Sequence, residues 1–161
     1  MAVTTLLPTF ALHLLSTPTH HQRPAASATL EAFTQFHHDR YLRYARARLD
    51  DPAAAATAVA ETFTDLSVVW KEILSSPSPA ALAWRILRHA VERRPRASDG
   101  EPAGPAFTAE QADAMLLHGH LDMPVAEAAD VMGIDDSLLR VRLASAQRLL
   151  CARSRESGAA T

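Results

Sequence analysis

Three arginines in the last quarter of the chain, Arg140, Arg142 and Arg148, have the clearest capacity to bind a ligand. Guanidinium groups bind phosphates and base edges, and in many proteins they do so from a helix that lies in the major groove of DNA. The residue types therefore point to nucleic acid as the ligand. We expect the three arginines to project from one helix or from its continuation.

The residues in front of these arginines have the spacing of a helix-turn-helix. Ala129, Gly133 and Leu139 supply, in order, a small side chain where two helices cross, a residue suited to a left-handed turn, and a large apolar side chain that returns to the core. In DNA-binding proteins the second helix of such a unit enters the major groove. A helical hairpin with a purely structural role can show the same pattern, so both interpretations stay open.

No combination of residues predicts an enzyme. A nucleophile, a base and an orienting acid do not occur together, and the chain lacks a glycine loop for phosphate. The single cysteine, Cys151, excludes an intrachain disulfide and a cysteine-based zinc site. The pair His37 and His38 and the pair His118 and His120 do not share a helix face. We therefore expect no metal and no cofactor.

The composition is that of a globular protein with a small net charge. The chain has 161 residues, of which 48% are hydrophobic and 21% are charged, enough for one moderate core or two small ones. The net charge of −2 argues against a protein that coats nucleic acid generally, although a local basic face is compatible with it. The apolar run TLLPTFALHLL is too short to cross a bilayer, and no Lys or Arg precedes it. We expect a cytoplasmic protein that does not associate with a membrane.

Helical spacing of the apolar residues predicts an all-α fold, and no segment alternates with the period of a strand. Asp51 with Pro52 is a strong helix start, and Thr108 with Gln111 is a capping-box pair. The expected helices cover residues of about 29–49, 52–74, 80–94, a segment from 108, 124–132 and 136–152.

Apolar stripes on these helices predict the core. The stripe of the second helix is the clearest, because its members advance by four and three residues. The residues expected to face the core are Leu30, Phe33, Leu42, Ala45, Leu49, Val59, Phe63, Leu66, Trp70, Ile73, Leu82, Ala83, Ile86, Leu87, Ala90, Val91, Ala112, Met115, Leu116, Leu139, Leu143, Ala146 and Leu150.

A proline- and glycine-rich segment divides the helices into two expected domains. Residues 95–106 contain three prolines, two glycines and no large apolar side chain, which is typical of a linker. The predicted organisation is an N-terminal extension (1–26), a first domain (27–94), the linker, a second domain (107–153) and a tail (154–161).

Together these segments resemble the small sigma factors of the sigma-70 family, the extracytoplasmic-function (ECF) type. YLRYARARLDDPAAAATAVAETF resembles the start of sigma region 2, PAALAWRILRHAVERR its later part, and AEQADAMLLHGHLDMPVAEAADVMGIDDSLLRVRLASAQRLL region 4. The resemblance covers about residues 30–152. It implies a bacterial protein that binds core RNA polymerase, opens the −10 promoter element with region 2 and reads the −35 element with region 4. An anti-sigma or other regulatory protein would be a further partner.

The resemblance also implies three sets of functional residues. Trp84 would be an exposed platform for an unpaired base, or would instead pack against the first helix. The −35 set is Ser137, Arg140, Val141, Arg142 and Arg148; the −10 set is Trp84, Arg85, Arg88, His89 and Arg93; the polymerase-binding set is Ala56, Thr57, Ala60, Glu61 and Asp65.

Two features depart from what these roles need. Asp135 and Asp136 suit the start of a helix, but they would repel DNA phosphates beside the arginines. Ala56, Thr57 and Ala60 stand where the family usually carries polar residues. The departures keep two alternatives open: a degenerate sigma-like regulator that acts through protein contacts with polymerase or another sigma factor, and a free-standing helix-turn-helix regulator.

Overall fold

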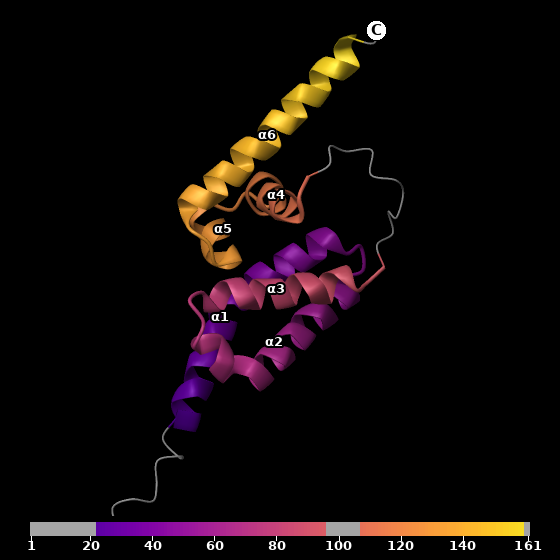
Figure 1. Cartoon of the computed structure of the whole chain (residues 1–161). Coiled ribbons are helices and arrows are strands. Elements are labelled where there is room, and N and C mark those ends of the chain that lie inside the picture. Colours follow the sequence, from indigo (N-terminus) through magenta and orange to yellow (C-terminus); the bar gives the residue numbers. More distant parts are fainter. Residues whose placement is uncertain (1–21, 96–106, 160–161) are drawn as a thin grey trace, which may run out of the picture.

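The computed structural model describes residues 22–95 and 107–159, which are helical apart from short connections (Figure 1). The helices are α1 (Gln22–Arg48), α2 (Pro52–Leu74), α3 (Pro79–Glu92), α4 (Ala109–Ala114), the π-helix η1 (Met115–His120), α5 (Val125–Met132) and α6 (Asp136–Ala159). Neither described range contains a strand, so the all-α prediction is confirmed. Within the same ranges, no helix is both long and apolar enough to cross a membrane.

Side-chain caps confirm two of the predicted helix starts. The Asp51 carboxylate accepts a hydrogen bond from the backbone N–H of Ala53 at 2.9 Å. Thr108 and Gln111 form a capping box, in which each side chain accepts a hydrogen bond from the backbone N–H of the other residue. Each such cap stabilises a helix by about 1 kcal/mol.

The predicted stripe of α2 is the centre of the packing between α1, α2 and α3. Val59, Leu66, Trp70 and Ile73 are buried, and Phe63 is partly buried. Because α1 and α3 both contact α2, its apolar face is covered from two sides. The spacing rule that identified the stripe therefore gave the correct buried face.

Both terminal helices are longer than predicted. α1 begins at Gln22, inside the predicted extension, because Pro24 falls in the first helical turn, where a missing N–H costs no hydrogen bond. α6 continues to Ala159 through most of the predicted tail, since no proline interrupts it. The rest of the extension and nearly all of the predicted linker lie outside the described residues.

The helices before and after the predicted linker share one core. Tyr44 and Leu87 belong to the same buried cluster as Met123, Val131 and Leu139. α5 packs against α3 and α1, and η1 also contacts α1. Figure 1 shows α4, α5 and α6 together on one side of α1 and α3. The division into two domains stays a prediction, but the first helix group (α1–α3) and the second helix group (α4–α6, with η1) are in contact.

The predicted buried face of the helix after residue 108 is only partly correct, since Met115 and Leu116 pack against the core without being fully buried. The residues expected in the core, which are only partly buried, are Ala112, Met115 and Leu116. The residues that are buried are Asp113, Ala114 and Leu117. Two causes displace the face: Asp113 is drawn to polar partners on α1 and α3, and the wider π-helical turns from Met115 change the angular spacing of the side chains.

The last predicted core residue of α6 is also wrong. Leu139, Leu143 and Ala146 are buried as expected, whereas Leu150 is 37% exposed. Residues 147–156 are all exposed, because α6 extends past the other helices; its yellow end projects from the body in Figure 1. Helical periodicity predicts which face of a helix is apolar, but not where the partner helices end.

Candidate functional site

The turn between α5 and α6 has the predicted helix-turn-helix geometry. Gly133 has a φ of 65° and a ψ of 37°, in the left-handed region, and Ala129 and Leu139 on either side of it are fully buried. A Cβ at Gly133 would lie 2.1 Å from the backbone N of Ala81 in α3. The Ser78 hydroxyl also donates a hydrogen bond to the Gly133 carbonyl at 2.8 Å. Glycine is thus needed both for the turn and for its close approach to α3.

The predicted −35 set lies on α6, between Ser137 and Arg148. Arg140 and Arg148 have no ion pair within the described ranges, so their guanidinium groups are available to a ligand. Arg142 lies about 200° around the helix from Arg140, and its charge acts on Glu110 of α4. The exposed members of the set are Ser137, Arg140, Val141 and Arg148, and Arg142 is partly buried.

Other side chains on α6 modify this surface. Asp135 and Asp136 are exposed at its N-terminus, where the helix dipole favours negative charge. Val141 is 61% exposed, and Leu138 is exposed beside it. The surface therefore combines two exposed arginines with two acids and two apolar side chains.

The predicted −10 set is not gathered on one exposed surface. Trp84 is only 3% exposed, and its ring centroid lies 4.5 Å from that of Tyr44 and 6.0 Å from that of Tyr41. The structure thus places Trp84 against α1, as in the packed alternative. The exposed members of the set are Arg85, His89 and Arg93, while Arg88 is partly buried.

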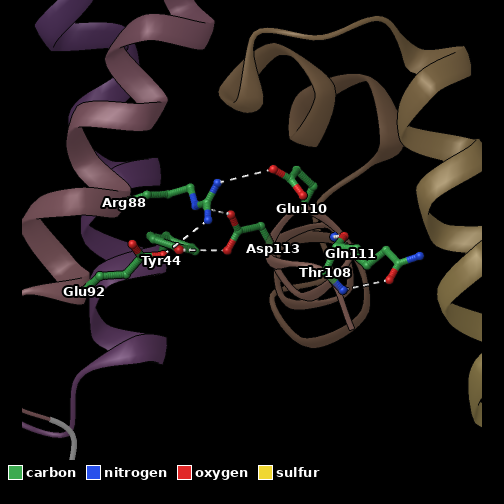
Figure 2. A network of polar contacts seen from close by, with 7 residues as sticks. All are labelled: Tyr44, Arg88, Glu92, Thr108, Glu110, Gln111 and Asp113. Carbon is green, nitrogen blue, oxygen red and sulfur yellow. Dashed lines mark hydrogen bonds and ion pairs between the residues drawn. The ribbon is translucent and has the colours of Figure 1, made fainter. Parts of the chain in front are cut away.

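Arg88 belongs to a polar network that joins α3 to α1 and α4 (Figure 2). The Tyr44 hydroxyl donates a hydrogen bond to Asp113 Oδ1 at 2.8 Å. Arg88 Nε lies 2.9 Å from Asp113 Oδ2, a charge contact without the alignment of a hydrogen bond. Arg88 also donates to Glu92 at 3.2 Å and lies 3.8 Å from Glu110. Since Asp113 is 1% exposed, its charge depends on Arg88 and Tyr44.

Burial and charge act in opposite directions on the pKa values of this network. Burial raises the pKa of Asp113 and outweighs the opposing effects of the Tyr44 hydrogen bond and the Arg88 charge. Burial acts to lower the pKa of Arg88, but the carboxylates of Asp113 and Glu92 outweigh it, and the pKa is raised. Burial also raises the pKa of Tyr44, so its hydroxyl keeps the proton that it donates. The buried carboxylate is the group that most needs its partners.

Two further polar contacts connect the same groups of helices. Arg40 Nε on α1 lies 2.9 Å from Glu127 Oε1 on α5, in a partly buried pair. Arg43 on α1 donates a hydrogen bond to the carbonyl of Leu121, which follows η1. Together with the Asp113 network and the contact at Gly133, they hold α4–α6 against α1 and α3 at several points.

The predicted polymerase-binding residues form an exposed but weakly polar face of α2. Ala56, Thr57, Ala60 and Asp65 are exposed. The Thr57 hydroxyl donates to the backbone carbonyl four residues earlier, at 2.9 Å. The Glu61 carboxylate lies 2.9 Å from Arg94 and 3.6 Å from Arg93, so it is occupied within the chain. The other charged member of this set, Asp65, has no ion pair inside the described residues.

A groove of about 780 Å³ lies between the second half of α2 and α3. The helix α2 departs from helical geometry at Val69, where φ is −111° and ψ is 15°. Ile73, Leu82 and Ile86 supply apolar walls. The polar residues at the groove are Asp65, Arg85, Arg88, His89 and Glu92, so it gathers three members of the predicted −10 set.

The polar residues of the contact between the helix groups were not predicted as functional: these are Tyr44, Asp113, Arg40 and Glu127. The only signal was an aspartate inside the otherwise apolar run ADAMLL, at a position where a solvent-facing acid is equally plausible. Within the described residues no group of three potential ligands could hold a metal ion.

In comparisons with known proteins, no family model matches the chain, and no curated protein matches it.

Proposed function

We propose that the chain is a sigma-like transcription factor of the ECF type, which contacts −35 promoter DNA with α6 and core RNA polymerase with α2. The observation that carries the proposal is the α5–Gly133–α6 turn, with Arg140 and Arg148 exposed on its second helix and without an ion pair inside the described residues. Two arginines eight residues apart on one helix can reach phosphates and base edges of the same groove.

The charges on α6 set an expectation for the strength of DNA binding. Two arginine-phosphate contacts release roughly two counterions, which predicts a shallow dependence of affinity on salt. Asp135 and Asp136 oppose the arginines at the end of the helix that would enter the groove. We therefore expect weak DNA binding by the chain alone and stronger binding in complex with polymerase.

The test is promoter binding and run-off transcription with purified core polymerase. The double variant Arg140→Ala/Arg148→Ala should lose at least about tenfold in promoter affinity, the equivalent of one or two charged contacts. Arg155→Ala removes an exposed arginine from the projecting end of the same helix and is the matched control, with unchanged binding expected. Blank run-off assays with saturating wild-type protein at every promoter tried would refute the proposal.

A second candidate, a sigma-like regulator that acts through protein contacts, is favoured by two observations. Trp84 and Arg88 are taken up by intramolecular packing, and the α2 face carries Ala56 and Ala60 where polar contacts are expected. Stable binding to polymerase or to another sigma factor without initiation would favour this candidate. DNA binding without polymerase binding would instead indicate a free-standing helix-turn-helix regulator.

A further inference from the structure

The contact between the two helix groups is centred on a carboxylate that is almost completely buried. Asp113 on α4 pairs with Arg88 on α3 and accepts a hydrogen bond from Tyr44 on α1, so this one side chain links α4 to α3 and to α1 (Figure 2). A buried carboxylate is costly unless it is paired, and the pairing in turn occupies the Arg88 guanidinium. Arg88 cannot offer the same nitrogen atoms to Asp113 and to a ligand.

We infer that Asp113 is an autoinhibitory latch, which holds α4–α6 against α1 and α3 and so keeps Arg88 from binding the phosphates of single-stranded DNA. The inference rests on the proposed function, because it concerns the regulation of its −10 surface. It goes beyond that function by assigning a role to a residue outside all three predicted sets.

The Asp113 carboxylate and a DNA phosphate can compete for the guanidinium group of Arg88. Both anions accept hydrogen bonds from the planar guanidinium in the same manner. When α4 moves away, Asp113 and Tyr44 become hydrated and Arg88 gains a free edge beside Arg85 and His89, which line the same groove. The pairing of Arg88 with Asp113 and its pairing with a DNA phosphate therefore compete for the same edge of the guanidinium.

Two of the other polar contacts across this boundary cost little to separate, whereas the partly buried hydrogen bond from Ser78 to the Gly133 carbonyl favours the closed state. Arg40 and Glu127 are each partly exposed, and Arg43, which donates to the Leu121 carbonyl, is exposed, so water can replace these hydrogen bonds at small cost. The apolar part of the boundary, which includes Met123 and Val131, favours the closed state. We expect the open state to be a minority species that a DNA or protein partner enriches.

The first experiment measures an intramolecular distance in the full chain. Spin labels on the native Cys151 of α6 and on an introduced cysteine, Glu72→Cys on α2, report the separation of the two groups; both positions are exposed. In this background, Asp113→Asn should lengthen and broaden the distance distribution. The same substitution should increase affinity for a short single-stranded oligodeoxynucleotide at least about tenfold, because a larger fraction of the protein is competent to bind.

Glu92→Gln is the matched control, because Glu92 also pairs with Arg88 but lies on α3, on the same side of the boundary. It removes one negative charge near Arg88 without releasing α4, so the distance should be unchanged and the affinity should rise much less. Equal distances in Asp113→Asn and Glu92→Gln would overturn the latch. A longer distance in Asp113→Asn without any oligonucleotide binding would show that Asp113 holds the two helix groups together, but it would overturn both the autoinhibitory role and the proposed binding of DNA at α3.

A cross-link provides a test that does not depend on the folding of Asp113→Asn. The variant Arg40→Cys/Glu127→Cys/Cys151→Ser places two cysteines across the boundary, where a short bifunctional maleimide can join them in the closed state. The cross-linked protein should lose oligonucleotide binding at least about tenfold relative to the same protein before cross-linking. Equal binding by the two forms would overturn the inference.

Discussion

His37 shows how one side chain can make the whole fold sensitive to pH. It is buried on α1 among aromatic rings, with centroids 4.1 Å from Phe33, 4.9 Å from Phe36 and 5.2 Å from Tyr41, and its Nδ1 has no hydrogen-bond partner within the described residues. Burial, and then the charge of Arg40, lower its pKa from 6.5 to about 4. The folded chain therefore holds this imidazole neutral.

The direction in which pH changes the stability follows from the lower pKa of His37 in the folded chain. Between pH 6.5 and about 4 the unfolded chain binds a proton at His37 that the folded chain does not, so the free energy of unfolding falls as the pH is lowered through this window. The loss attributable to His37 is at most about 3 kcal/mol. In urea unfolding measured at several pH values, the free energy of unfolding of His37→Leu should change less over this window than that of the wild type.

His38 is the matched control for this prediction, because it is adjacent in sequence and exposed. His38→Leu should keep the pH dependence of the wild type. If His37→Leu and the wild type lose stability in parallel from pH 7 to pH 4, the buried neutral imidazole is not the cause.

At the scale of helices and turns, the joint between α5 and α6 is also the point where the second helix group meets α3. Gly133→Ala would force a side chain into a left-handed turn and, in addition, into the backbone of Ala81. We expect a loss of more than about 3 kcal/mol in the free energy of unfolding, since the turn penalty alone is of the order of 1 kcal/mol.

Gly119→Ala tests whether that loss is specific to the joint. Gly119 lies in η1, and among the described residues a Cβ there would meet Met115 Cε alone, at an ordinary distance of 3.8 Å. Its stability should stay within about 1 kcal/mol of the wild type, because alanine is favoured over glycine in a helix. A similar loss in both variants by urea unfolding would contradict the role assigned to the contact with α3.

The elements were largely predictable because their signals are local. The Asp51 cap, the α2 stripe and the Gly133 turn each need only neighbouring residues to be recognised, and each is confirmed. The contact between the helix groups was not predictable, because Asp113 and Trp84 take their environments from helices distant in sequence. Helical periodicity placed Trp84 outside the apolar stripes of its own helix. Trp84 is nevertheless buried because it packs against Tyr44 on α1, and local sequence patterns do not reveal such a contact.

At the scale of the whole molecule, the candidate sites divide according to their dependence on that contact. Four of the five members of the −35 set on α6 are exposed in the closed arrangement, and Arg142 is partly buried. The −10 set is divided between exposed residues and the packed Trp84 and Arg88. Such a chain can present one candidate DNA surface while withholding another, which links the opening of this contact to the proposed activity.

The shared core predicts that the full chain unfolds as one cooperative unit. Both tryptophans, Trp70 and Trp84, lie on α2 and α3, so their fluorescence reports the first helix group, whereas circular dichroism reports all helices. The two signals should follow a single urea transition, because loss of either group exposes the apolar cluster of the other. In Asp113→Asn the two curves should separate. Separate transitions already in the wild type would mean that the two groups are stable without each other and that their boundary contributes little.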